Sequence, residues 1–362
     1  MRKNLLKIAK ELLSLPTAPF REEKVRQYIK AFCAERRIAV REDDFGNLVA
    51  TCGAKYAGPV LAFDAHMDHP GFIVERDSRR GRTTALFYGG VDEHYFRGTA
   101  VRVFTDGGSV AGRVTETAFD LKKRIKRVRL ALDGEVKRGD VAMWDLEPFR
   151  LRAGRIYSRG CDDVVGCVSV LALFDELIRR RVKRKVLGIF TVAEEAGLNG
   201  AKHLARKGTI PKSAAIVAIE TSRELPVARI GDGAVIRVGD SVSIFSPAMT
   251  RFMMEVAARL KETEPNFRAQ RKLMDGGSCE ATVYHAFGYT VGAACIPLGN
   301  YHNRDYARRK IAAEYVSVDD LVNMVKLFAA MVERASDLPG VLHRRPPAYT
   351  EQRRRLGERL LF

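Results

Sequence analysis

Apolar and polar positions follow two different periods along the chain. Residues 1–30 carry apolar side chains at helical spacing, with a break at residues 16–20, and this pattern predicts amphipathic helices. Residues 186–192 form a short apolar run that predicts a buried strand, and Glu194 and Glu195 follow directly. Carboxylates are costly to bury unless they are paired or bind a metal. Taken alone, this acidic pair is most simply a solvated strand end.

The order of the predicted elements indicates an α/β core with an insertion. Residues 59–66 predict another buried strand, and after residue 158 helices and strands alternate, which is typical of a layered core with a mixed, mainly parallel sheet. Between these stretches, short strand-like pieces alternate with turns that contain Gly and Asp, which predicts a small β-rich domain. We therefore expect a core of residues 1–69 and 158–340, an inserted domain at 70–157 and a peripheral basic tail at 341–362.

Composition narrows the class of protein. The chain has 362 residues, of which 46% are hydrophobic and 29% charged, as in ordinary soluble proteins. No apolar run approaches the roughly 20 residues that a bilayer crossing needs, and the N-terminal residues lack a signal-peptide core. The six cysteines include no C-x-x-C pair, which favours reduced, mostly buried thiols. We expect a cytoplasmic protein that does not enter a membrane.

The net charge of +18 could serve nucleic-acid binding, binding of acidic substrates or simple solubility. Basic residues are spread along the chain, with local runs at 121–129, 178–185 and 343–355. None of these runs is interleaved with the aromatic residues of an RNA-binding module. The pattern therefore favours a solvated surface over a specific nucleic-acid site.

Acids and histidines gather where the predicted elements end, which is where ligands bind in open α/β sheets. Histidine and carboxylate with few thiolates suit zinc, cobalt or manganese, and two ions roughly 3.5–4 Å apart need one bridging carboxylate. Singly, His66 could be a core histidine, Asp162 a helix N-cap and His302 a loop residue, but together they favour a binuclear metal site. The full set is His66, Asp68, Asp162, Asp163, Glu194, Glu195, Glu220 and His302.

Several motifs resemble those of the cocatalytic metallopeptidases, the group that includes the M42, M28 and M20 families. They are H-M-D at 66–68, D-D-V-V-G at 162–166, E-E-A-G-L-N-G-A at 194–201, the strand-end acid Glu220 and the late His302. The first helices and the D-D-F-G-N turn are also similar, so that the resemblance covers about residues 4–335. It implies a three-layer, phosphorylase/hydrolase-like core and two bound divalent ions, most simply zinc, with cobalt or manganese as alternatives.

The resemblance also implies a set of metal ligands. His66 and Glu220 would hold one metal ion. Glu195 and His302 would hold the other, and Asp162 would bridge both.

Two further acids would act on the reaction without binding metal. Asp68 would hydrogen-bond the imidazole of His66 and fix its tautomer. Glu194 would be the general base that takes a proton from water and passes it to the leaving amine.

The place of the insertion favours M42 within this group. His66 and Asp162 are 96 residues apart, whereas Glu220 and His302 are only 82 apart. M20 enzymes typically insert their lid after the strand-end acid, and M28 enzymes usually keep the interval from His to Asp short. M42 members are aminopeptidases that commonly assemble through the inserted domain, which implies a homo-oligomer between a dimer and a dodecamer.

Some residues depart from the usual M42 motifs. His69 replaces the Glu of H-x-D-E, Glu220 replaces an Asp, G-G-S-C-E-A at 276–281 replaces G-T-D-A, and P-L-G-N-Y-H at 297–302 replaces P-x-R-Y-x-H. All metal positions are kept, so we expect hydrolysis, while specificity stays open. Cys161 and Cys279 are expected near the site, with packing favoured over a redox or ligand role.

Three functions follow from these patterns. The first is a binuclear aminopeptidase that acts on small peptides. The second is a related amidohydrolase or carboxypeptidase that acts on N-acyl amino acids or dipeptides, which the altered segments suggest. The third is a non-enzymatic binding protein that uses the positive charge, although such a scaffold has no need of the full ligand set.

Overall fold

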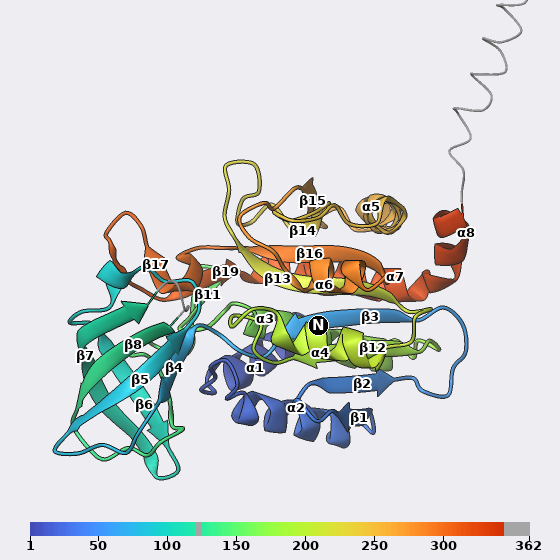
Figure 1. Ribbon diagram of the computed structural model, residues 1–362. Helices are drawn as coiled ribbons and strands as arrows, with labels where there is room; N and C mark the ends of the chain where they lie inside the picture. The colour runs from blue at the N-terminus through green and yellow to red at the C-terminus, as the bar shows by residue number, and fades with distance from the viewer. Residues whose placement is uncertain (121–124, 344–362) are drawn as a thin grey trace, which may run out of the picture.

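An eight-stranded sheet runs through the α/β part of the computed structural model, which describes residues 1–120 and 125–343 (Figure 1). The four central strands, β12, β3, β13 and β16, are parallel to one another, and β2 and β14 flank them in the opposite direction. The mixed, mainly parallel sheet is therefore confirmed. In spatial order the strands are β1 (Ala39–Glu42), β2 (Leu48–Cys52), β12 (Val186–Thr191), β3 (Leu61–His66), β13 (Ala215–Arg223), β16 (Thr290–Leu298), β14 (Ala234–Arg237) and β15 (Ala269–Lys272).

Helices cover both faces of this sheet and complete the three layers. Burial of apolar side chains drives the packing, since every residue of β3 and β12 is buried. Phe63 of β3 packs on Phe328 of α7 with ring centroids 4.6 Å apart. The core of one face contains α1 (Arg2–Leu13), α2 (Glu23–Glu35), α3 (Val164–Arg179), α5 (Pro247–Thr263) and α7 (Val318–Glu333), continued by α8 (Leu338–His343), whereas that of the other contains α4 (Asn199–Lys207) and α6 (Glu280–Ala286).

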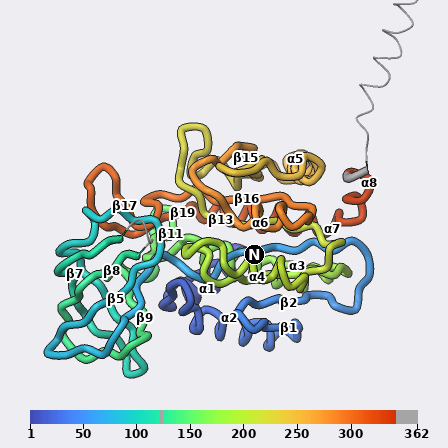
Figure 2. Tube along the Cα trace, in the orientation of Figure 1, coloured from blue at the N-terminus to red at the C-terminus, as the bar shows by residue number. Residues whose placement is uncertain are grey.

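The β-rich stretch closes into an antiparallel barrel, which its strand pattern alone did not predict. Phe72, Phe87, Phe96 and Trp144 fill its interior with edge-on ring contacts. Figure 2 shows the chain leaving the α/β part after β3 to form the barrel, which lies at one end of the molecule. In closure order the strands are β4 (Gly71–Val74), β5 (Arg82–Tyr88), β8 (Ile125–Leu132), β7 (Gly108–Asp120), β6 (Ala100–Thr105) and β9 (Val141–Trp144).

The end of the expected insertion lies outside the barrel. Strands β10 (Arg150–Arg152) and β11 (Arg155–Ser158) form a separate small sheet with β19 (Glu314–Ser317). A hairpin of β17 (Arg304–Asp305) and β18 (Lys310–Ile311) reaches the barrel, where Arg304 pairs with Asp92 at 3.3 Å. The boundaries at residues 69–70 and 157–158 stay a prediction.

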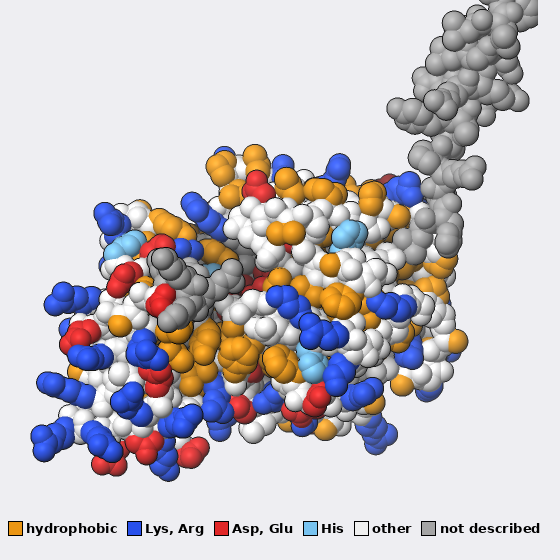
Figure 3. Space-filling model, in the orientation of Figure 1, with side chains coloured by type: hydrophobic (Ala, Val, Ile, Leu, Met, Phe, Trp, Pro, Cys, Tyr) orange, Lys and Arg blue, Asp and Glu red, His pale blue; other side chains and the backbone are white. Residues whose placement is uncertain are grey.

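The cysteines and the basic surface residues agree with what the composition predicts. All six cysteines are buried and free. Lys and Arg side chains are scattered over the face shown in Figure 3 rather than gathered in one patch. None of the helices formed by residues 1–120 and 125–343 has both the length and the apolar character that crossing a membrane requires. Residues 121–124 and 344–362 lie outside the described residues; they include the first part of the basic run at 121–129 and most of the run at 343–355 and of the expected tail.

Candidate metal centre

The five expected ligands come together where the parallel strands end. His66 is the last residue of β3, and Glu220 lies toward the end of β13. Asp162 precedes α3, Glu195 follows β12, and His302 lies in a 3₁₀ turn after β16. Their ligand atoms form two groups that share Asp162, one with His66 and Glu220 and one with Glu195 and His302, and within each group these atoms lie within 4.8 Å of one another. Their role as metal ligands stays a prediction.

Asp162 lies between the two imidazoles. Its Oδ1 is 3.7 Å from His66 Nε2, and its Oδ2 is 3.4 Å from His302 Nε2. The Thr221 hydroxyl donates a hydrogen bond of 2.8 Å to Oδ1 and fixes the carboxylate plane. One oxygen therefore faces each group, as a carboxylate that bridges two ions requires.

The residues after Asp162 show how the second acid of the D-D-V-V-G motif is accommodated. Asp163, and not Asp162, is the N-cap of α3. The Asp163 carboxylate packs directly against Gly166, where a Cβ atom would lie 2.0 Å from Asp163 Oδ2. The glycine of the D-D-V-V-G motif therefore leaves room for this second, buried carboxylate.

The electrostatics of the centre favour a cation. Within the described parts of the chain, no Lys or Arg forms an ion pair with the site carboxylates. Burial raises the pKa of Glu220 to about 8 and that of Glu194 well above its ordinary value, because desolvation penalises the charged form. Burial also opposes ionisation of Asp162, but the imidazoles of His302 and His66 outweigh it and hold this pKa low.

A buried ring nitrogen faces two carboxylates at this place. His302 Nε2 lies 2.9 Å from Glu195 Oε1 and 3.4 Å from Asp162 Oδ2, and neither contact has the geometry of a hydrogen bond. An imidazole lone pair and several uncompensated carboxylates are the donor set that a divalent metal ion takes. The residues present therefore fit the expected metal ions.

The two remaining candidates border the ligand groups. Glu194 Oε2 is 3.9 Å from His66 Nε2, and its side chain is 12% exposed. The Asp68 carboxylate accepts hydrogen bonds of 3.0 Å from the backbone amides of Glu194 and Glu195. His66 Nδ1 lies 3.1 Å from the main-chain oxygen of Asp68 and 3.6 Å from its carboxylate. The contact at hydrogen-bond distance is thus with the Asp68 backbone rather than with the expected side chain.

The sequence model of the family described as M42 glutamyl aminopeptidase matches residues 46–327, which include every candidate residue of the centre. The chain belongs to the M42 family. The protein is therefore a metal-dependent aminopeptidase, a hydrolase, and neither the amidohydrolase nor the binding-protein alternative is favoured.

Individual relatives agree with this family. A protein of Acetivibrio thermocellus named as an aminopeptidase is 26% identical over 327 residues, which cover 86% of this chain and 93% of that protein. The glutamyl aminopeptidase of Lactococcus lactis is 24% identical over 271 residues, or 66% of this chain and 74% of the relative. The structure of the Pyrococcus horikoshii TET1 peptidase superposes with a TM-score of 0.73 at 24% identity, covering 91% of this chain and 99% of the other.

One buried acid of this M42 chain was missed by the sequence interpretation. Glu314 of β19 accepts hydrogen bonds from the backbone amides of Asp162 (3.1 Å) and His302 (2.8 Å), so that it holds two expected ligands. His69, which stands where the M42 motif has Glu, lies beside it, with Nδ1 3.9 Å from Glu314 Oε2 and 2.6 Å from the Asp162 carbonyl oxygen. The only sequence signal for Glu314 is an acid within a largely apolar stretch, 311–318.

The altered M42 segment at 276–281 has an exposed and a buried half: residues 276–278 line a cavity beside Glu220, whereas residues 279–281 are buried. Cys279 is buried, and its amide donates a hydrogen bond to Asp240 Oδ2 at 3.0 Å. Cys161 is buried too, and burial raises the thiol pKa of both residues well above its usual value. Both cysteines are therefore neutral packing residues in this structure.

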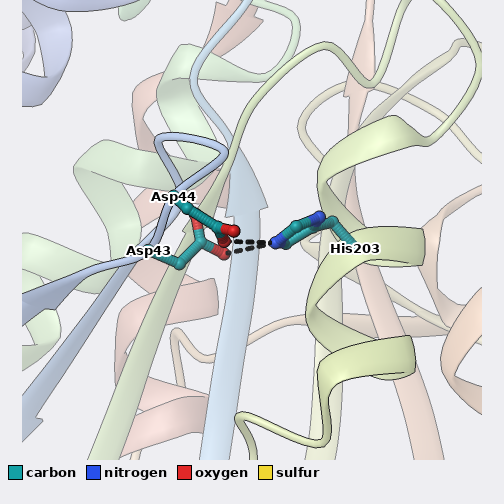
Figure 4. Close-up of side chains that lie close together, drawn as sticks. All are labelled: Asp43, Asp44 and His203. Carbon is teal, nitrogen blue, oxygen red and sulfur yellow. Dashed lines mark hydrogen bonds and ion pairs between the residues drawn. The ribbon is translucent and has the colours of Figure 1, made fainter.

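A third group of ligand-type residues lies away from the M42 centre. His203 of α4 faces Asp43 and Asp44, with Nε2 2.8 Å from Asp44 Oδ1 (Figure 4). Lys207 also pairs with Asp44, and the Asp43 carboxylate caps its own turn by accepting two backbone hydrogen bonds. These partners already balance the acids, so the group is an ion-pair cluster on the surface.

Proposed function

We propose that this M42 protein binds two divalent metal ions around Asp162, zinc in the simplest case and cobalt or manganese otherwise, and removes N-terminal residues from small peptides. His66 and Glu220 hold one ion, and Glu195 and His302 hold the other. The observation that carries the proposal is the position of the Asp162 carboxylate, with one oxygen toward each imidazole.

The side chains around the ions have distinct tasks in this reaction. Two such ions, when bound, polarise the scissile carbonyl and lower the pKa of a water molecule. Glu194 belongs to neither ligand group, so its carboxylate is free to take a proton from the attacking water and to give it to the leaving amine. Asp68 keeps Glu194 in place through its backbone amide.

A comparison of substrates tests this function. After loading with Zn²⁺, Co²⁺ or Mn²⁺, the protein is expected to hydrolyse aminoacyl-p-nitroanilides, which have a free α-amine, and to leave N-acylated amino acids intact. Release of p-nitroaniline and of free amino acid measures the two reactions. Hydrolysis of the blocked substrates alone would contradict an aminopeptidase.

We also propose that the first residue of the peptide is acidic. A cavity of about 200 Å³ opens beside Glu220 and is lined by Arg223, Arg237 and Arg304. Arg237 of β14 is only 3% exposed, and its Nε is buried without a partner while Nη2 donates to Met274 O at 3.2 Å. A buried guanidinium with a free donor favours a carboxylate. The glutamyl aminopeptidase name of the family and of the Lactococcus lactis relative supports the same substrate.

Substitution of Arg237 is expected to change this preference. Arg237→Met should lower kcat/KM for glutamyl-p-nitroanilide by about 10- to 100-fold, because a hydrogen bond to a charged group contributes about 1.5–3 kcal/mol. Hydrolysis of the alanyl substrate should change much less. Arg271→Met is the control, since it removes the same charge from an exposed position on the neighbouring strand β15. An equal loss on both substrates would show that Arg237 does not read the side chain.

The assembly of a structural relative and the cysteines of the chain support proposals for the assembly and the location of the protein. The Pyrococcus horikoshii TET1 peptidase assembles into a tetrahedron or a large octahedral shell. We propose that this chain also forms a homo-oligomer, through the inserted domain at residues 70–157. The reduced cysteines support a cytoplasmic location.

A further inference from the structure

Four consecutive backbone amides after β12 are each held by a buried side-chain oxygen. The amide of Val192 donates to Asn47 Oδ1 at 3.1 Å, and that of Ala193 donates to Glu22 Oε1 at 2.9 Å. The amides of Glu194 and Glu195 donate to the two carboxylate oxygens of Asp68. Each backbone amide of residues 192–195 therefore keeps a hydrogen-bond acceptor where the chain leaves the sheet. Buried backbone groups require such acceptors.

The oxygens come from three separate parts of the chain. Glu22 is the N-cap of α2, Asn47 lies in the turn before β2, and Asp68 follows β3. All three side chains are at most 1% exposed. Water therefore cannot substitute for them without rearrangement of the core.

The held backbone is one that the sequence would not adopt on its own. Ala193 has a φ of 52°, in the left-handed region that disfavours residues with a Cβ atom. This turn directs the next two side chains, Glu194 and Glu195, toward the metal centre. The hydrogen bond from the Ala193 amide to Glu22 is thus the contact that acts most directly on the direction of these two side chains.

Contacts around Asn47 show how closely this segment is packed. Asn47 Nδ2 donates to the carbonyl of Gly200 at 3.3 Å, and the Gly200 amide donates to Val192 O at 2.9 Å. A Cβ atom on Gly200 would lie 2.4 Å from Asn47 Oδ1 and 2.6 Å from Val192 O. The last glycine of the E-E-A-G-L-N-G-A motif is therefore required by the approach of Asn47.

From this geometry we infer that Glu22 and Asn47 are positioning residues of the peptidase, which act by holding the backbone that carries Glu194 and Glu195. The inference rests on the metal and base roles given to these two residues under the proposed function. Glu22 acts as a hydrogen-bond acceptor, since its Oε1 also accepts from the amide of Phe20 at 2.8 Å. Neither Glu22 nor Asn47 belongs to a ligand group.

The acceptor role does not require a charge on Glu22. Burial, aided by the nearby charge of Asp68, raises the pKa of Glu22 to about 8, so that the neutral acid predominates at pH 7. Its carbonyl oxygen accepts both amides in that form. Glutamine has the same shape and the same acceptor, whereas leucine has neither oxygen.

Metal titration and kinetics of four proteins test the inference: wild type, Glu22→Gln, Glu22→Leu and Glu23→Leu. Glu23 is the control, because it is a neighbouring acid with a side chain 44% exposed. Zn²⁺ binding to the metal-free proteins is measured calorimetrically, and kcat is measured per folded, metal-loaded chain. We expect Glu22→Leu to weaken one of the two Zn²⁺ sites, the one that contains Glu195, by about 10- to 100-fold, and to lower kcat by a similar factor with little change in KM. Glu22→Gln and Glu23→Leu should behave as wild type.

The outcomes separate this inference from the proposed function. Wild-type metal affinity and kcat in Glu22→Leu would overturn the inference, and so would a Glu22→Gln variant as impaired as Glu22→Leu. Equal weakening of both Zn²⁺ sites would indicate a merely structural role and would also overturn it. If wild type hydrolyses no peptide but the loss at one site is seen, the proposed function fails while the positioning role stands. If Glu22→Leu does not fold, Asn47→Ala replaces it, because this variant removes the acceptor for the Val192 amide. We then expect the same weakening of the site that contains Glu195 and the same loss of kcat. Wild-type metal affinity and kcat, or equal weakening of both Zn²⁺ sites, would again overturn the inference.

Discussion

Replacement of Glu194 by glutamine is expected to lower kcat by about 10²- to 10⁴-fold while both metal ions stay bound. Glutamine keeps the size of the side chain but cannot take a proton, and general base catalysis typically contributes a factor of this size. Glu194 belongs to neither ligand group, so the ions should be held as before. Steady-state hydrolysis of aminoacyl-p-nitroanilides and elemental analysis of the same protein sample measure the two quantities.

The position of Glu194 makes this variant informative. Its neighbour Glu195 lies 2.9 Å from His302, so Glu195→Gln should reduce metal content as well as activity. The two variants, Glu194→Gln and Glu195→Gln, therefore distinguish a general base from a metal ligand at adjacent positions. A fully active Glu194→Gln enzyme would show that the proton goes elsewhere, and a loss of metal from it would make Glu194 a ligand.

Replacement of Asp162 by alanine is expected to have the larger effect, because it removes the shared member of both groups. The variant should bind less than one ion per chain at Zn²⁺ concentrations that saturate wild type. Its kcat should fall by about 10³-fold or more, since metal ions supply several kcal/mol to the transition state and each 1.36 kcal/mol is tenfold in rate. Elemental analysis and kinetics after gel filtration check both expectations.

The surface cluster around His203 supplies the control for this experiment. Asp43, Asp44 and His203 also bring three ligand-type side chains together, but their charges are already paired. His203→Gln should therefore leave both metal content and kcat unchanged. If it removes an ion while Asp162→Ala does not, the metal site lies on the surface and the assignment of the centre is wrong.

Much of the architecture can be read from local pattern. The apolar runs at 59–66 and 186–192 predict β3 and β12, because a strand that is buried on both faces reads as a continuous apolar run. Later segments with apolar residues at helical spacing predict α3, α5 and α7. The expected site residues could be named for a related reason. Parallel strands end at one edge of a sheet, so acids and histidines placed just after several strands are brought together.

The contacts that order the centre were not predictable in this way. Glu22 lies 171 residues from Ala193, and Glu314 lies 152 residues from Asp162. Neither acid belongs to a motif, and each lies in a sequence that reads as a helix start or a strand. The closure of the barrel has the same character, since strand pairing between β4 and β9 depends on residues about 70 positions apart in sequence.

By itself, the sequence determined the layered α/β core, the family and the residue types at each strand end, because these follow from periodicity and short motifs. Only the tertiary structure decided that Asp162 turns one oxygen toward each imidazole, that Asp68 meets two amides with its carboxylate, and that Arg237 is buried beside Glu220. These features depend on backbone direction and burial at contacts between distant segments. Local sequence does not encode such contacts, since each partner is placed only when the whole core has packed.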